Sequence, residues 1–103
     1  MVKYKKIDVS KIDEKPHLPH LGWNTVYPQK ESALFRNIDL ERGFYFLHSY
    51  YFNCNDENDV LATSKYGIEF ASAINHKNVY GCQFHPEKSH QNGIEIFRNF
   101  ANL

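Results

Sequence analysis

His85 and Glu87 are the residues whose types and spacing most clearly suggest chemistry. They lie in the run Gln-Phe-His-Pro-Glu-Lys-Ser at residues 83–89. Two residues apart in an extended segment, both side chains can lie on the same side, and Pro86 between them restricts the backbone. A carboxylate beside an imidazole holds one tautomer and stabilises the imidazolium that forms on protonation. The pair therefore suggests the base and orienting carboxylate of a nucleophilic triad, although the spacing alone is also typical of a solvated His and Glu.

The elements around this pair are predicted to display it at the edge of a sheet. A strand is expected over residues 79–84, and a helix is expected to begin after Ser89 as its N-cap. The apolar residues of that helix at positions 94, 97 and 101 fall on one face, with 96 and 100 beside them. Open α/β folds place their sites at such strand-to-helix junctions.

The preceding residues predict mainly strands. Strands are expected at 2–9, 21–27 (closed by Pro28), 44–52, 60–64 and 68–74, the last two as a hairpin. An extended loop is expected around Pro16 and Pro19, a short helical turn from Ser32 to Ile38, and a polar loop at 53–59. Segment 44–52 is almost wholly aromatic or apolar, which is typical of a strand buried on both faces. Such a sheet needs covering layers that one long helix does not supply, so we expect missing layers or a partner polypeptide.

Composition narrows the class of protein. The 103 residues include 12 Lys and Arg against 12 Asp and Glu, so no basic excess favours nucleic-acid binding. No apolar run is long enough to span a membrane. Two cysteines are too few for a disulfide framework, and a cytoplasmic location is expected. The spacing of the histidines at 17, 20, 85 and 90 fits no standard zinc pattern, so no metal site is expected.

Residues 83–89 resemble the His-Pro-Glu signature of class I glutamine amidotransferases. Residues 19–24, Pro-His-Leu-Gly-Trp-Asn, and 44–51, Phe-Tyr-Phe-Leu-His-Ser-Tyr-Tyr, are similar to segments of the glutaminase subunits of imidazole glycerol phosphate synthases. The three motifs occur in the family's order, and the resemblance runs from near Met1 to Leu103. It implies an α/β fold, with residues 1–103 as the C-terminal part of a flavodoxin-like amidotransferase domain, strand-rich with a C-terminal helix.

The resemblance also implies roles for individual residues. His85 resembles the general base and Glu87 its orienting carboxylate, while Ser49 and Tyr50 resemble the segment that holds the amino-acid end of glutamine. Three residues resemble the surface that docks on a cyclase (β/α barrel) subunit: Trp23, Asn24 and Lys88. In such enzymes ammonia released from glutamine passes to the cyclase without meeting bulk water, and no cofactor is implied.

The chain departs from the family pattern at the nucleophile. The Gly-x-Cys-x-Gly motif and the glycine-rich oxyanion loop are absent from these 103 residues. Cys82, in an expected strand, and Cys54, in the polar loop, are better explained as a structural and an exposed thiol, because a reactive thiol needs an electropositive setting. We therefore expect this chain alone not to hydrolyse glutamine. A separate N-terminal fragment would have to supply the nucleophile, unless that segment has been lost.

Several alternatives remain open. The chain can be a non-catalytic module that docks on a barrel through Trp23 and Lys88, and Trp23 can equally be a core residue. The ammonia can serve histidine biosynthesis or the amidation of a surface sugar. If half of a sheet is missing, open apolar edges such as 44–52 would favour self-association.

Overall fold

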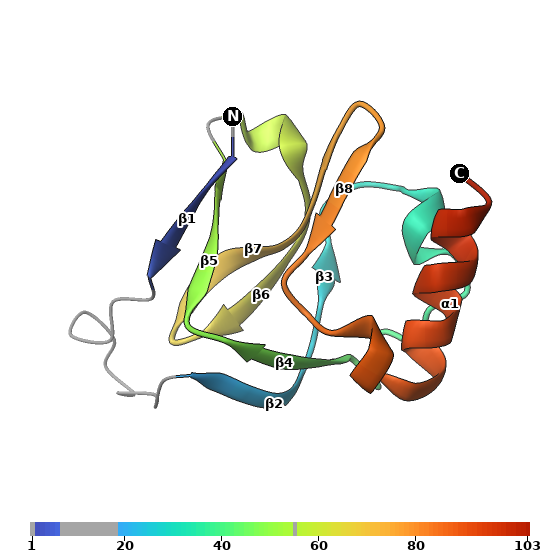
Figure 1. Cartoon of the computed structure of the whole chain (residues 1–103), viewed down its shortest axis with the longest axis horizontal. Coiled ribbons are helices and arrows are strands. Elements are labelled where there is room, and N and C mark those ends of the chain that lie inside the picture. Colours follow the sequence, from blue (N-terminus) through green and yellow to red (C-terminus); the bar gives the residue numbers. More distant parts are fainter. Residues whose placement is uncertain (1, 7–18, 55) are drawn as a thin grey trace.

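The computed structural model describes residues 2–6, 19–54 and 56–103, which form two antiparallel sheets and one α-helix. The larger sheet has six strands in the order β1-β5-β7-β6-β3, and β5 and β8 pair with different stretches of β7. These strands are β1 (Val2–Lys6), β3 (Tyr27–Pro28), β5 (Tyr50–Cys54), β6 (Val60–Tyr66), β7 (Ile68–His76) and β8 (Val79–Cys82). The smaller sheet joins β2 (His20–Asn24) to β4 (Phe44–His48). In Figure 1, helix α1 (His90–Ala101) lies at one end of the molecule, beside β4 and the strand-to-helix junction.

The prediction of one strand at 44–52, buried on both faces, is wrong. The segment is two strands, because the chain leaves the smaller sheet at Ser49 and enters the larger sheet as β5. Within β4 the burial alternates: Phe44 and Phe46 are fully buried, whereas Leu47 is 37% exposed. The outward residues of β4 pair with outward residues of β2, Leu47 with Leu21 and Tyr45 with the residue at position 23. The apolar residues of β4 therefore divide between a core face and an exposed face. One edge of β4 is covered because β2 pairs along it.

The prediction of a single strand at 21–27 is also wrong. Strand β2 ends at Asn24, and Tyr27 begins β3 in the other sheet. Pro28 is itself a residue of β3, where it pairs with Ala62 of β6, so it does not lie after the end of a strand. Proline is tolerated there because β3 is an edge strand of the order given above.

Other predicted elements are confirmed with shifted ends. The β6–β7 hairpin forms and extends to Tyr66 and His76, with Gly67 at a φ of 76° in the turn. A 3-10 turn, η2 (Ala33–Phe35), follows Ser32, whose hydroxyl accepts a hydrogen bond from the Leu34 amide. The polar loop is shorter than predicted, since β5 reaches Cys54 and a 3-10 turn, η3, covers Glu57–Asp59. Residues 7–9 of the first predicted strand, the loop around Pro16, and residue 55 lie outside the described residues.

Helix α1 turns a different face inward from the one that its apolar residues predict. Ile94 and Phe97 are 51% and 54% exposed, whereas Asn92, Gly93 and Ile96 are buried. A Cβ on Gly93 would lie 1.7 Å from the carbonyl oxygen of Pro86, so only glycine lets the helix approach this closely. The inner face is therefore selected by a close backbone contact and by a polar side chain, neither of which hydrophobic periodicity detects.

Asn92 braces the helix against the loop before β4. Its amide group donates to the carbonyl oxygens of Asp39 and Gly43, both at 2.8 Å, and its oxygen accepts from the Asp39 amide at 3.1 Å. Asn92 is 3% exposed, so these bonds satisfy an otherwise costly buried amide.

Aromatic rings from both sheets and from the strand-to-helix junction form the core. Phe44 and Phe84 stack with their centroids 4.1 Å apart, and Phe84 also contacts Phe46 edge-on. A backbone bridge between Phe46 and Phe84 joins the smaller sheet to the junction that follows β8. No helix among the described residues is both long enough and apolar enough to cross a membrane.

Candidate active site

The structure places His85 and Glu87 in direct contact. The Nδ1 atom of His85 lies 2.9 Å from Oε1 of Glu87, a short hydrogen bond between the ring and a carboxylate. Pro86 begins a 3-10 turn, η4 (Pro86–Lys88), in which Glu87 is the middle residue. Both side chains remain accessible, at 36% and 54% exposure. The pair therefore has the geometry of a base and its orienting group, and the base can be reached by a reacting group.

The backbone of His85 is fixed from two sides. Its amide donates to the carbonyl oxygen of Tyr45 in β4 at 2.8 Å. The Ser89 hydroxyl donates to the His85 carbonyl oxygen at 2.6 Å and accepts from the Tyr45 amide at 3.0 Å. Ser89 is the N-cap residue of α1, as predicted, but its fully buried side chain makes no hydrogen bond to the amide groups of the helix. Its hydroxyl links the backbone of His85 to that of Tyr45 in β4.

The contacts of His85 define which nitrogen can act as a base. Because the Glu87 carboxylate accepts a hydrogen bond, Nδ1 carries the proton in the neutral ring. Nε2 then keeps its lone pair, and it lies 3.3 Å from the carbonyl oxygen of Leu47. Once Nε2 takes a proton, the ring can donate to Glu87 and Leu47 at the same time. The site is thus arranged to stabilise the imidazolium that a general base becomes.

Ser49 and Tyr50 lie at the crossing from β4 to β5, directly after the Leu47 carbonyl that faces His85. Together with His48 and Gln83 they line an open hollow of about 500 Å³. Gln83 stands two residues before His85, and its Oε1 atom is buried without a hydrogen-bond partner. The structure therefore brings the predicted substrate segment to the predicted base. Sequence reasoning did not single out His48 or Gln83, although both lie within the motifs it used.

Two of the three predicted docking residues share one surface. Trp23 is 45% exposed, and its ring meets Tyr45 and His90 edge-on, at centroid distances of 6.2 Å and 5.4 Å. The Nζ atom of Lys88 lies 5.9 Å from the centroid of Tyr45. Trp23 is therefore neither buried in the core nor isolated, and we call these four residues the Trp23 surface.

Asn24, the third predicted docking residue, uses its side chain within the chain. Its Nδ2 atom donates to the Lys65 carbonyl oxygen at 2.6 Å, and its Oδ1 atom accepts from the Thr25 amide at 2.7 Å. Nδ2 also lies 3.3 Å from Nε2 of His20. The polar atoms of Asn24 therefore hold β2 against the C-terminal end of β6 and contact a buried histidine.

The two thiols have surroundings that disfavour a reactive thiolate. Burial, with a smaller contribution from Glu87, raises the pKa of Cys82 to about 11. Burial and then the charge of Asp59 raise the pKa of Cys54. Both effects oppose the low thiol pKa that a nucleophile needs. They support the prediction that neither cysteine is a reactive nucleophile.

Potential metal ligands do not converge in the part of the chain that the structure describes. Within residues 2–6, 19–54 and 56–103, no group of three His, Cys, Asp or Glu side chains is placed to hold a metal ion. His17, one of the histidines considered from the sequence, lies outside that part.

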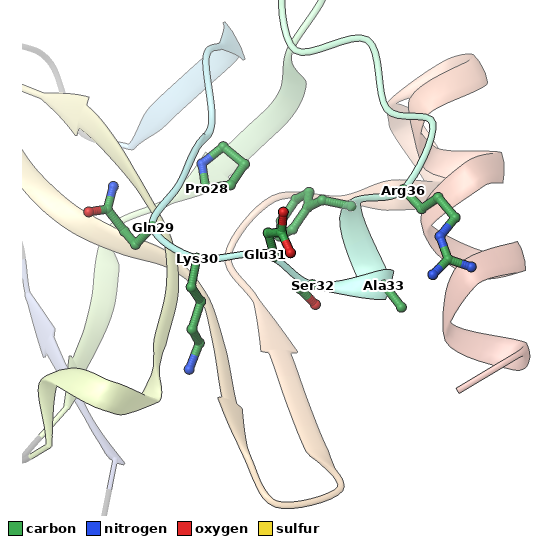
Figure 2. Close-up of a pocket in the computed structure, with 8 residues that line it drawn as sticks. Pro28, Gln29, Lys30, Glu31, Ser32, Ala33 and Arg36 are labelled. Carbon is green, nitrogen blue, oxygen red and sulfur yellow. The ribbon is translucent and has the colours of Figure 1, made fainter.

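A second hollow, of about 680 Å³, is lined by residues 28–33, Phe35 and Arg36. Its charged side chains do not converge: Figure 2 shows Lys30 toward one end of the labelled loop and Arg36 at the other, with Glu31 between them. None of its lining residues belongs to the predicted site. A ligand site usually has a few polar groups aimed at one point, and this loop lacks that arrangement.

Comparisons with known proteins agree with this geometry. The family model for class-I glutamine amidotransferases matches residues 6–103. Similar proteins include imidazole glycerol phosphate synthase subunit HisH of Leptospira borgpetersenii, 48% identical over 101 residues, which are 98% of this chain and 50% of the relative. HisH of Sulfurimonas denitrificans is 47% identical over 99 residues, 96% of this chain and 47% of the relative. HisH 1 of Methanococcus maripaludis is 44% identical over 98 residues, 95% of this chain and 48% of the relative.

The chain spans about half the length of these curated relatives. The family match nevertheless covers the His85–Glu87 pair, the Ser49–Tyr50 segment and the Trp23 surface. The chain belongs to the class I glutamine amidotransferase family.

Proposed function

We propose that this chain is the glutaminase portion of an imidazole glycerol phosphate synthase and contributes the base and carboxylate that release ammonia from glutamine for histidine biosynthesis. The 2.9 Å bond between His85 and Glu87 is the observation that carries the proposal. The names of the relatives support the assignment to this synthase. The proposal includes a cytoplasmic location and no cofactor.

In the proposed reaction His85 first acts as a base. Glu87 holds the proton on Nδ1, so Nε2 takes the proton of a cysteine thiol that a segment outside these residues supplies. The thiolate attacks the carboxamide carbon of glutamine, and the imidazolium returns its proton to the departing ammonia. Water then hydrolyses the glutamyl thioester to glutamate. Ser49 and Tyr50 would hold the amino-acid end of glutamine in the adjoining hollow.

The Trp23 surface is proposed to dock on a cyclase barrel. It combines a half-exposed indole, a phenol ring and the Lys88 ammonium, which are residue types that interfaces favour or that can pair with an acidic partner. This surface does not depend on the missing nucleophile. It therefore also favours a second candidate, a non-catalytic module that binds a barrel without chemistry. An enzyme that supplies ammonia for the amidation of a surface sugar is the remaining alternative.

Complementation separates these candidates. The chain is mixed with the N-terminal half of the Leptospira borgpetersenii HisH relative and with a cyclase subunit, and glutamate and ammonia are measured from glutamine. We expect release only when the complementing half is present and its loss with His85→Ala. Barrel binding without any release would favour the non-catalytic module, and release by this chain alone would contradict the missing-nucleophile account.

Docking is tested separately by the affinity for the cyclase subunit. Lys88→Ala is expected to weaken binding about tenfold, because a hydrogen-bonded interface charge contributes on the order of 1–3 kcal/mol. Lys65→Ala removes an exposed lysine near the C-terminal end of β6 and serves as the matched control. Equal binding of both variants would contradict the proposed docking surface.

A further inference from the structure

Two buried histidines that the proposed chemistry does not use connect β2 to the substrate segment. His20 and His48 are 3% and 8% exposed and occupy paired positions in the β2–β4 sheet. The Nδ1 atom of His20 lies 2.8 Å from Nε2 of His48. The Nδ1 atom of His48 lies 2.7 Å from the carbonyl oxygen of Tyr50, and Nε2 of His20 lies 3.3 Å from the Asn24 amide nitrogen.

The groups at the two ends of this series of hydrogen bonds, the Tyr50 carbonyl and the Asn24 amide, determine which atom donates in each bond. The Tyr50 carbonyl can only accept, so Nδ1 of His48 must carry a proton. In the neutral ring Nε2 of His48 is then bare and accepts from Nδ1 of His20. That leaves Nε2 of His20 bare, where it accepts from the Asn24 amide. Asn24 is itself oriented, because its oxygen accepts from the Thr25 amide at 2.7 Å.

The surrounding rings keep both imidazoles neutral and fixed in plane. His20 stacks between Phe46 and Tyr66, with centroids 4.8 Å and 4.0 Å away and planes within 16° and 15°. Phe70 closes the edge of both rings. Burial, followed by the neighbouring His48, lowers the pKa of His20 to about 4, and burial also lowers the pKa of His48. At neutral pH, a single arrangement of protons on His20 and His48 therefore allows every hydrogen bond in the series to form.

This series of hydrogen bonds ends at the Tyr50 carbonyl, in the segment that is proposed to hold glutamine. Ser49 lies between β4 and β5 and belongs to neither strand, and Tyr50 is the first residue of β5, where it pairs with Lys6 at the end of β1. The same short segment carries the Leu47 carbonyl that faces Nε2 of His85. A ring that grips the Tyr50 carbonyl therefore fixes the crossing beside the base.

We propose that His48, held in one tautomer by His20, is a positioning residue that sets the Ser49–Tyr50 segment for glutamine binding. This inference rests on the proposed function for its substrate and on the geometry alone for its hydrogen-bond chain. It assigns a role to the histidine within the Phe-Leu-His-Ser-Tyr run and to the one in the Pro-His-Leu run. It also connects Asn24 on β2 to the substrate segment.

A matched pair of substitutions separates the two bonds of His48. Asparagine places an amide near the position of Nδ1, so His48→Asn can still donate to the Tyr50 carbonyl but loses the link to His20. Glutamine places its amide near the position of Nε2, so His48→Gln can still accept from His20 but loses the bond to Tyr50. A residue that only fills space would respond alike to both changes.

The first measurement uses nitrogen-15 and carbon-13 NMR of this chain and needs no activity. We expect both histidines to show a protonated Nδ1 and a bare Nε2 at pH 7. The carbonyl resonance of Tyr50 is expected to move in His48→Gln and to stay near its place in His48→Asn. A protonated Nε2 on His48 in the wild-type chain would overturn the inference even if neither variant folds.

The second measurement is glutamine kinetics of the complemented enzyme. His48→Gln is expected to raise KM about five- to tenfold, the loss of one hydrogen bond, with kcat within about twofold. His48→Asn is expected to keep KM within about twofold. Equal rises in both variants would overturn the positioning role. An inactive wild-type complex would defeat the proposed function instead, and the NMR result would still decide the hydrogen-bond chain.

Discussion

Lowering the pH from 7 to 4 is expected to destabilise the fold through His20, which is buried between two aromatic rings. In the folded chain the pKa of this ring is about 4, against 6.5 for an unperturbed histidine. Between pH 4 and pH 6.5, His20 is therefore protonated in the unfolded chain and neutral in the folded chain. His20 therefore does not reduce the free energy of unfolding above pH 6.5, and it lowers that free energy progressively as the pH falls toward 4.

The size of the loss follows from the two pKa values. Each pH unit between them costs about 1.4 kcal/mol, so the full effect of His20 is about 3 kcal/mol. A small domain is stable by roughly 5–15 kcal/mol, so this single ring is a large fraction of the total. His48 acts in the same direction because its pKa is also lowered. Among the described residues, Tyr66 is the other titratable side chain whose ring contacts His20.

Urea unfolding followed by far-ultraviolet circular dichroism at pH 7, 6, 5 and 4 measures the effect. The informative variant is His20→Asn, which keeps a donor toward His48 but has no proton to gain. It should be less stable at pH 7, because the stacked ring is lost, yet it should lose about 3 kcal/mol less than the wild-type chain on acidification. His90→Asn removes an exposed ring at a φ of 53°, which asparagine tolerates, and is the control. Equal acid losses in the wild-type chain and His20→Asn would refute the reasoning.

Three further outcomes are expected. Gly93→Ala should destabilise the fold by more than about 2 kcal/mol in urea unfolding, because its methyl group would meet the Pro86 carbonyl oxygen at 1.7 Å; a near-neutral result would contradict that packing. Cys82, whose pKa is raised to about 11, should react with iodoacetamide at pH 8 about a hundredfold more slowly than a free thiol, as followed by mass spectrometry. Labelling at the rate of a free thiol would count against its burial. Glu87→Gln in the complemented enzyme should lower kcat about a hundredfold or more with KM little changed, since a neutral amide no longer stabilises the imidazolium; unchanged glutamate formation would exclude Glu87 as the orienting group.

The part of the site that is contiguous in sequence was predictable. His85 and Glu87 lie within one turn of each other, so their contact depends only on local backbone geometry, and Pro86 restricts that geometry. The β6–β7 hairpin also depends on neighbouring residues, because the two strands are adjacent in sequence and are joined by the turn at Gly67. For these features the interactions that decide the structure lie within a few residues of each other.

The features that depend on strand register were not predictable. His20 and His48 meet only because β2 and β4 pair with those two residues opposite each other, and a single-residue slip would separate them. The split at Ser49 likewise depends on two sheets that compete for one apolar segment. The signal that was present is a histidine inside each of two apolar runs, which is unusual for a residue that prefers a polar setting.

Asn92 has a consequence for how freely this sequence can change. Its amide supplies two donors and one acceptor to three backbone groups of the same loop, and no other side chain of similar length offers that combination. Aspartate would present acceptors to two carbonyl oxygens, and leucine would leave all three groups unpaired. In a library that randomises this codon, nearly every surviving clone should encode the original residue. The exposed apolar positions of the same helix, Ile94 and Phe97, should accept many replacements unless a complementing polypeptide covers them.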